Sequence, residues 1–144
     1  MRTISLALVL VAAAGNGRVA SARDEAPVEE QVPSGVWKLE VRDRVDGELQ
    51  GEARSVPLRF RVIRNRVSGH PADDEPDRAR LTGEVVVGKA TVVTWRQDNS
   101  NIEGYSSFCT GRVVENGKIV GTWHDTEGQS GDFVLSFQKK QPSP

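Results

Sequence analysis

Residues 106–125 decide the fold, and their sequence is SSFCTGRVVENGKIVGTWHD. Two runs with alternating apolar and polar or small residues flank Glu115-Asn116-Gly117-Lys118. Asn-Gly between such runs is the strongest short-range signal for a β-hairpin, because a type I′ turn needs positive φ angles that these two residues tolerate. The segment therefore predicts two antiparallel strands joined by a tight turn.

The length of this turn sets which side chains point inward. A two-residue turn pairs Val114 with Ile119 and Thr110 with Trp123, whereas a three-residue loop shifts the pairing by one and sets Cys109 opposite Trp123. We expect the two-residue turn, because it gathers the larger apolar side chains on one face. The side chains expected on that inward face include Phe108, Arg112, Val114, Ile119, Trp123 and Asp125.

The rest of the chain repeats the strand pattern. Residues 35–45 and 56–62 alternate apolar and polar side chains with a period of two, which is typical of half-buried strands. Further runs occupy residues 66–69, 79–87, 89–96, 104–114, 119–125 and 131–138, with glycines and polar turns between them. We predict an all-β domain over residues 35–140, an eight-stranded antiparallel up-and-down meander. Such a meander removes its exposed edges by closing into a barrel.

The N-terminal segment has the features of an export signal. Arg2 precedes an apolar run at residues 4–14, and Ala20-Ser21-Ala22 matches the small-x-small pattern at which signal peptidase cleaves. We predict a signal peptide at residues 1–22 that is cleaved before Arg23, which gives a periplasmic or secreted protein. Residues 23–34 are acidic and interrupted by prolines, so we expect a flexible tether, and residues 141–144 are expected to be a disordered tail.

Composition excludes several functions. Without Arg2 and Arg18, 17 basic residues stand against 20 acidic ones, and this net charge of −3 argues against nucleic acid as a partner. A single cysteine excludes a disulfide framework and a thiolate-rich zinc site within one copy. The acidic loop at residues 73–77 lacks the spacing of a calcium-binding loop. We expect no metal, no cofactor and no membrane span.

Several short motifs resemble those of avidins and lipocalins. Ser34-Gly35-Val36-Trp37 resembles the opening of their first strand. Further motifs similar to avidin strands, in the same order, are Asn65-Arg66-Val67-Ser68-Gly69, Leu81-Thr82-Gly83, Thr91-Val92-Val93-Thr94-Trp95-Arg96, Phe108-Cys109-Thr110-Gly111, Asn116-Gly117-Lys118 and Thr122-Trp123. The resemblance implies a barrel with Trp37 at its floor and aromatic rings around a ligand.

The same resemblance assigns the ligand site and argues against biotin. It implies that Trp95, Phe108 and Trp123 surround the ligand's ring system. The polar side chains that bind the biotin ureido oxygen are replaced by Leu39, Asp43 and Pro71. A buried carbonyl without hydrogen-bond partners is severely penalised, so we expect a different ligand.

The predicted function is that of an exported, non-catalytic binding protein for a small flat or amphipathic ligand in the barrel mouth. Arg112 and Asp125, both inward in the expected register, would form an internal salt bridge or anchor an anionic group. If the register differs, both are solvated. The alternative function is an interaction or structural domain with a solid core and a working outer face, and a homo-oligomer stays open as a partner.

Cys109 leaves three interpretations. It would lie opposite His124 in the expected register, and a thiolate paired with a base is a nucleophile. No orienting third group is identifiable, so an enzyme is the remote alternative. The other two are a small apolar core residue and a thiol that forms an intermolecular disulfide.

Overall fold

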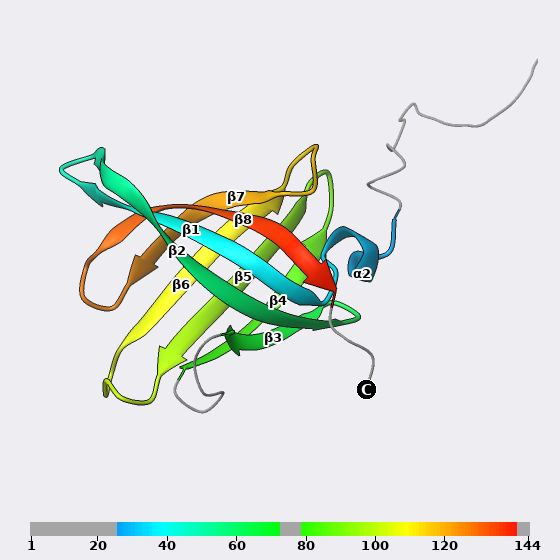
Figure 1. The fold of residues 1–144 in the computed structure, drawn as a ribbon, viewed down its shortest axis with the longest axis horizontal. Coiled ribbons are helices and arrows are strands. Elements are labelled where there is room, and N and C mark those ends of the chain that lie inside the picture. The colour runs from blue at the N-terminus through cyan, green and yellow to red at the C-terminus, as the bar shows by residue number, and fades with distance from the viewer. Residues whose placement is uncertain (1–25, 73–78, 141–144) are drawn as a thin grey trace, which may run out of the picture.

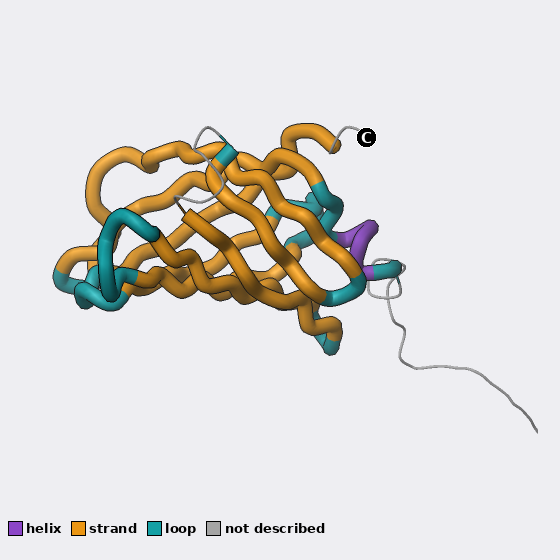
Figure 2. The backbone as a smooth tube through the Cα atoms, turned by 90° about the horizontal axis from the view of Figure 1, so that it is seen from below, coloured by secondary structure: helices purple, strands orange, loops and turns teal. Residues whose placement is uncertain are grey.

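The computed structural model describes residues 26–72 and 79–140, and it confirms the eight-stranded barrel. The strands pair in sequence order, each antiparallel to the next, and β8 returns to β1 to close the sheet (Figure 1). Figure 2 shows the strands running obliquely around an elongated barrel. The strands are β1 (Gly35–Val45), β2 (Glu48–Ile63), β3 (Arg66–Pro71), β4 (Ala79–Val87), β5 (Thr91–Asn99), β6 (Ser106–Val113), β7 (Ile119–Asp125) and β8 (Ser130–Lys140).

Three predicted segments lie outside the described residues: the signal peptide at 1–22, the acidic loop at 73–77 and the tail at 141–144. In the described part of the chain, no helix is both long and apolar enough to cross a membrane.

Aromatic rings in mutual contact run through the barrel interior. Ring centroids lie 5.9 Å apart for Trp37 and Phe60, 5.5 Å for Phe60 and Trp95, and 5.1 Å for Trp95 and Phe133. Phe137 continues this row of rings on the other side of Trp37, with the two ring centroids 5.2 Å apart. The first four of these rings are at most 3% exposed. Burying a ring such as Phe60 stabilises the folded protein by about 1.5–3 kcal/mol.

Glycines stand opposite the large rings and let the strands approach closely. Gly83 pairs with Trp95, and Gly131 pairs with Trp123. A Cβ atom at Gly83 would lie 2.0 Å from the carbonyl oxygen of Thr94, and one at Gly131 would lie 1.8 Å from that of Arg42. Glycine in a strand marks such close approaches. The narrow barrel therefore needs glycine at these positions, and the rings occupy the space beside them.

The segment before β1 closes one end of the barrel, so the prediction of a flexible tether through residue 34 is wrong for its second half. The short helix α2 (Val28–Gln31) lies against this end (Figure 1). Val32 is fully buried, and Gln31 accepts a hydrogen bond of 2.5 Å from the Thr91 hydroxyl. The indole N–H of Trp37 donates to the carbonyl of Pro33 at 3.0 Å. A buried valine and glutamine hold the segment in place despite its acidic, proline-rich sequence.

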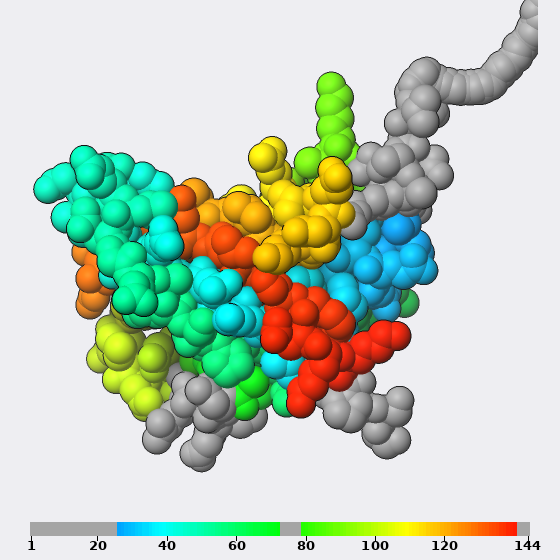
Figure 3. Space-filling model, turned by 45° about the horizontal axis from the view of Figure 1, so that its top comes forward, coloured from blue at the N-terminus to red at the C-terminus, as the bar shows by residue number. Residues whose placement is uncertain are grey.

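At the opposite end, β1 and β2 extend beyond the barrel as a hairpin, which projects clearly in Figure 3. Every residue from Glu48 to Ser55 is exposed, and the alternation at 56–62 had predicted only the buried part of this strand. The turn is tight because Asp46 and Gly47 have φ angles of 51° and 84°. Both are positive, as a type I′ turn requires.

Candidate functional site

The turn at residues 114–118 contains the three-residue loop and not the expected two-residue turn, so the expected register is wrong. Val113 pairs with Ile119, and Cys109 pairs with Trp123. Gly117 has a φ of 84°, but Asn116 does not have a positive φ. A type I′ turn needs both, so the hairpin closes instead through hydrogen bonds from the Val114 amide to the Lys118 carbonyl (2.8 Å) and from the Gly117 amide to the Val114 carbonyl (2.9 Å).

This one-residue shift divides the five predicted site residues. Trp95, Trp123 and Asp125 are buried inside the barrel at 3%, 9% and 6% exposure. Phe108 and Arg112 lie on the outer wall, because successive side chains of a strand point to opposite faces. The inward position predicted for Phe108 and Arg112 is therefore wrong, and the internal salt bridge between Arg112 and Asp125 does not form.

Asp125 organises the loop that follows it. Its Oδ1 accepts hydrogen bonds from the backbone amides of Glu127 (2.9 Å) and Gln129 (2.8 Å), and its Oδ2 accepts one from the Tyr105 hydroxyl (3.1 Å). Burial of the Tyr105 hydroxyl is the larger cause, and this hydrogen bond the second, of a pKa of Tyr105 that is raised above 10.0. The carboxylate is satisfied by the protein, so it is not a free anchor for a ligand.

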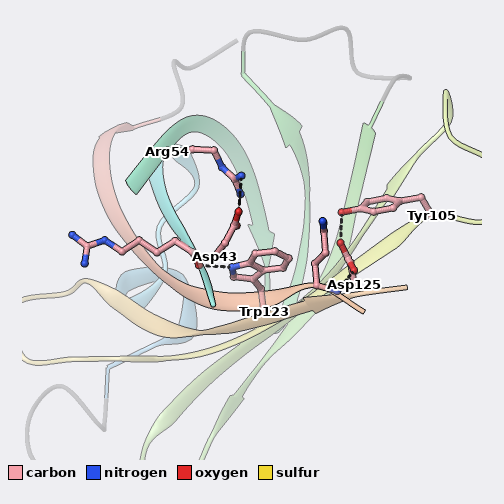
Figure 4. A network of polar contacts seen from close by, with 7 residues as sticks. Asp43, Arg54, Tyr105, Trp123 and Asp125 are labelled. Atoms are coloured by element: carbon pink, nitrogen blue, oxygen red, sulfur yellow. Dashed lines mark hydrogen bonds and ion pairs between the residues drawn. The ribbon is translucent and has the colours of Figure 1, made fainter. Parts of the chain in front are cut away.

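Trp95 and Trp123, the two tryptophans predicted for the ligand site, differ in their polar contacts. The Trp123 indole N–H donates to the Arg42 carbonyl at 3.3 Å, across Gly131 (Figure 4). The Trp95 Nε1 is buried without a hydrogen-bond partner among the described residues. Nearby at the barrel mouth, Arg54 and Asp43 form an exposed ion pair at 2.9 Å, also drawn in Figure 4.

Cys109 and His124 do not meet. Cys109 faces the interior between Trp95 and Trp123 in the strand pairing. It is 8% exposed, and burial raises the pKa of its thiol to about 12. His124 lies on the outer wall, stacked on Phe108 with ring centroids 5.2 Å apart and an interplanar angle of 23°. The thiolate–imidazole pair therefore has no geometric basis, and a buried thiol is poorly placed for an intermolecular disulfide.

The outer wall carries two adjoining cavities, which we call together the outer-wall groove. Both cavities include Arg96 and Phe108. The larger, about 790 Å³, lies beside the loop between β5 and β6 and is lined by Arg80, Arg96, Asp98, Asn99, Ser100, Ile102, Glu103, Gly104, Tyr105, Ser106, Phe108 and Thr126. The smaller, about 450 Å³, is lined by Arg66, Thr82, Gly83, Glu84, Thr94, Trp95, Arg96, Phe108, Cys109 and Thr110.

A hydrogen-bond network fixes the polar side of the larger cavity. Asp98 accepts a bond of 2.5 Å from the Ser106 hydroxyl and one of 2.8 Å from Arg96 Nε. The Ser106 hydroxyl and then Arg96 hold the pKa of Asp98 below 3.8. The Arg96 guanidinium lies 5.9 Å from the centroid of the Phe108 ring. Arg96, Phe108 and His124 come from three neighbouring strands in the same cross-strand row.

Sequence reasoning missed this groove for a definable reason. The period-two pattern identified Phe108 as an inward residue because it is large and apolar, and only the turn geometry reverses that orientation. No group of three or more His, Cys, Asp or Glu side chains in the described ranges is arranged to hold a metal ion.

Fold and groove together define the class of this protein as a small closed up-and-down β-barrel with a cavity on its wall. A scan against protein-family models and a search of curated proteins both give no match for the sequence.

Proposed function

We propose that this chain is an exported, non-catalytic binding protein that takes a small amphipathic ligand in the outer-wall groove. The observation that carries the proposal is the pair of cavities of about 790 and 450 Å³ that adjoin at Phe108 and Arg96. The larger has the size of an ordinary small-molecule site, which is roughly 300–1,000 Å³.

Packing inside the barrel favours the wall over the mouth as the ligand site. The rings of Trp37, Phe60, Trp95 and Phe133 contact one another in sequence and occupy the interior. The mouth site that the sequence suggested relied on Phe108 as its third aromatic wall, and Phe108 is on the other side of the sheet. A ligand in the groove needs no rearrangement of the core.

The lining of the groove points to an uncharged, hydroxyl-rich ligand. Its three arginines, Arg66, Arg80 and Arg96, are balanced by Glu84, Asp98 and Glu103. A site with balanced charge gains little from a charged ligand. Thr94, Thr110, Ser100 and Thr126 supply hydroxyls, while Phe108 and Ile102 supply apolar surface. Saccharides combine hydroxyl groups with an apolar ring face, so we propose a saccharide as the ligand class.

Chemical-shift mapping tests the site and the ligand class together. The ¹⁵N-labelled protein is titrated with neutral disaccharides, with sugar acids and with indole as a flat apolar probe. We expect the neutral disaccharides to move the amide signals of Thr82, Arg96 and Phe108 on the outer wall. Shifts confined to mouth residues such as Val41, Val56 and Trp123 would overturn the wall site and place the ligand in the mouth.

A pair of variants separates binding from folding. Phe108→Ala removes the apolar surface shared by both cavities, and we expect it to weaken binding about tenfold or more, as loss of a central aromatic contact does. Thr122→Ala, on the neighbouring strand but outside the groove, is the matched control. Equal binding by both variants would contradict the proposal, and near-ultraviolet circular dichroism of the tryptophans checks that both remain folded.

Export is part of the same proposal. The basic residue, apolar run and small-residue motif in residues 1–22 support cleavage before Arg23. N-terminal sequencing of the protein recovered from outside the cytoplasm should begin at Arg23. An N-terminus at Met1 in that fraction would contradict cleavage, and recovery of the protein only from the cytoplasm would contradict export.

A further inference from the structure

One row of side chains on the outer wall has an order that suits a second copy of this chain. Strand pairing aligns Arg112 of β6, Val120 of β7, Val134 of β8 and Glu40 of β1 across the barrel. Val120 is 41% exposed, Val134 is partly exposed and Arg112 is exposed. The row therefore runs from a basic residue through two accessible valines to an acidic residue. Figure 3 turns this side of the molecule toward the viewer, with β8 in orange to red beside β1 in cyan.

This order is complementary to itself. A two-fold axis that lies between two facing copies, parallel to the strands and midway between β7 and β8, places β7 of one copy over β8 of the other. Val120 then meets Val134 of the second copy, and Arg112 meets Glu40 of the second copy. Because a two-fold interface repeats every contact, each valine contact and each ion pair occurs twice.

The charges of the row also favour a partner. Arg112 forms no ion pair with any residue in the described part of the chain. Glu40 has only a loose contact of 3.8 Å with Lys38, and its side chain is 38% exposed. Both groups are therefore available for an ion pair between copies.

The next row toward the barrel mouth adds no repulsion to this arrangement. It contains Thr110, Thr122, Asp132 and Arg42 in the same strand order. The same axis sets Thr122 opposite Asp132 of the second copy, where a hydroxyl can donate to a carboxylate. The axis also sets Thr110 opposite Arg42 of the second copy. No like charges face each other in either row.

We propose that the face formed by β7 and β8, with Arg112 and Glu40 at its margins, associates with the same face of a second copy to form a symmetric dimer. The convex wall of a barrel limits the contact to a few strands, so the dimer forms reversibly and its population depends on concentration. The ligand groove lies nearer the mouth around Phe108 and shares only Thr110 with this face. The dimer does not depend on the ligand proposal.

Charge reversal tests the proposal by sedimentation velocity over a range of concentrations. Arg112→Glu alone, and Glu40→Arg alone, place like charges in contact, and each is expected to raise the dimer dissociation constant about tenfold or more. The double variant with both substitutions restores opposite charges and should recover dimerisation. A wild-type protein that is monomeric at every concentration would overturn the proposal, as would a double variant that dimerises no better than the single ones.

Two controls keep the test specific to this face. Arg61→Glu reverses an exposed charge on β2, away from the row, and should leave the dissociation constant unchanged. Val120→Thr keeps the shape but adds a hydroxyl at the centre of the face, whereas Val86→Thr makes the same change at an exposed valine on β4. We expect only Val120→Thr to weaken the dimer. Equal effects of the two valine variants would contradict the placement of the axis.

Discussion

Substituting Gly131 with alanine tests the close packing of β8 against β1 and Trp123. The added Cβ would lie 1.8 Å from the Arg42 carbonyl oxygen and 2.6 Å from Trp123 Nε1. The first obstacle is backbone, so it cannot turn aside as a flexible side chain would. Overpacking costs about 1–3 kcal/mol, and loss of the Trp123 hydrogen bond to Arg42 adds about 1 kcal/mol. We expect Gly131→Ala to lower the free energy of unfolding by about 2–4 kcal/mol.

Urea unfolding followed by tryptophan fluorescence measures this loss, with Gly88→Ala as the matched control. A Cβ at Gly88 would have its nearest neighbour, the Ala90 carbonyl oxygen, at 3.9 Å, which is ordinary contact. There alanine should change stability by less than about 1 kcal/mol, through the entropy of the unfolded chain. Equal stability of the two variants would refute the assignment of Gly131 as a residue that the barrel needs.

Three further predictions follow from single groups. Cys109, with its pKa raised to about 12, should react with a thiol reagent at pH 8 only after unfolding, and rapid reaction of the folded protein would contradict its inward position. Tyr105 is the only tyrosine of the chain, so ultraviolet titration should give a midpoint above 10.0, and Asp125→Asn should lower that midpoint. Because the pKa of Tyr105 is higher in the folded than in the unfolded protein, it contributes stability below about pH 10, which is lost as pH rises through the pKa of the folded protein. The lowered pKa of Asp98 contributes stability above pH 3.8 that is lost as pH falls through the folded value, so Asp98→Asn should remove that acid-side loss in urea titrations.

Within residues 26–72 and 79–140, the two Asx-Gly turns explain how far local signals reach. Asp46-Gly47 and Asn116-Gly117 carry the same sequence signal, and both end a strand. Asp46 adopts a positive φ and forms the two-residue turn, while Asn116 keeps a negative φ and the loop lengthens. Both conformations are accessible to an Asx residue, so packing of the strands beyond the turn selects between them. The position of a turn was therefore predictable from the sequence, but its length was not.

The segment before β1 shows the same limit for a different reason. Its charges and prolines predict an unstructured chain, and they describe its composition correctly. Its position against the barrel comes from Val32 and Gln31, each of which finds a buried place at the barrel end. Val28 and Val32, the two valines that pack on the core here, are too few to define a periodicity, so no pattern could have revealed their contacts.

The architecture of this protein is encoded locally, because the period-two alternation and the regular turns depend only on residues that are close in the sequence. Those features determined the all-β class, the number of strands, their antiparallel order and closure of the barrel. The inner and outer faces of β6 are decided by pairing across the sheet, where a shift of one residue exchanges them. That shift moved Phe108 and Arg112 to the outer wall and left the aromatic core inside. The cavities, the self-complementary row and the buried thiol all depend on contacts between strands, which no stretch of sequence contains.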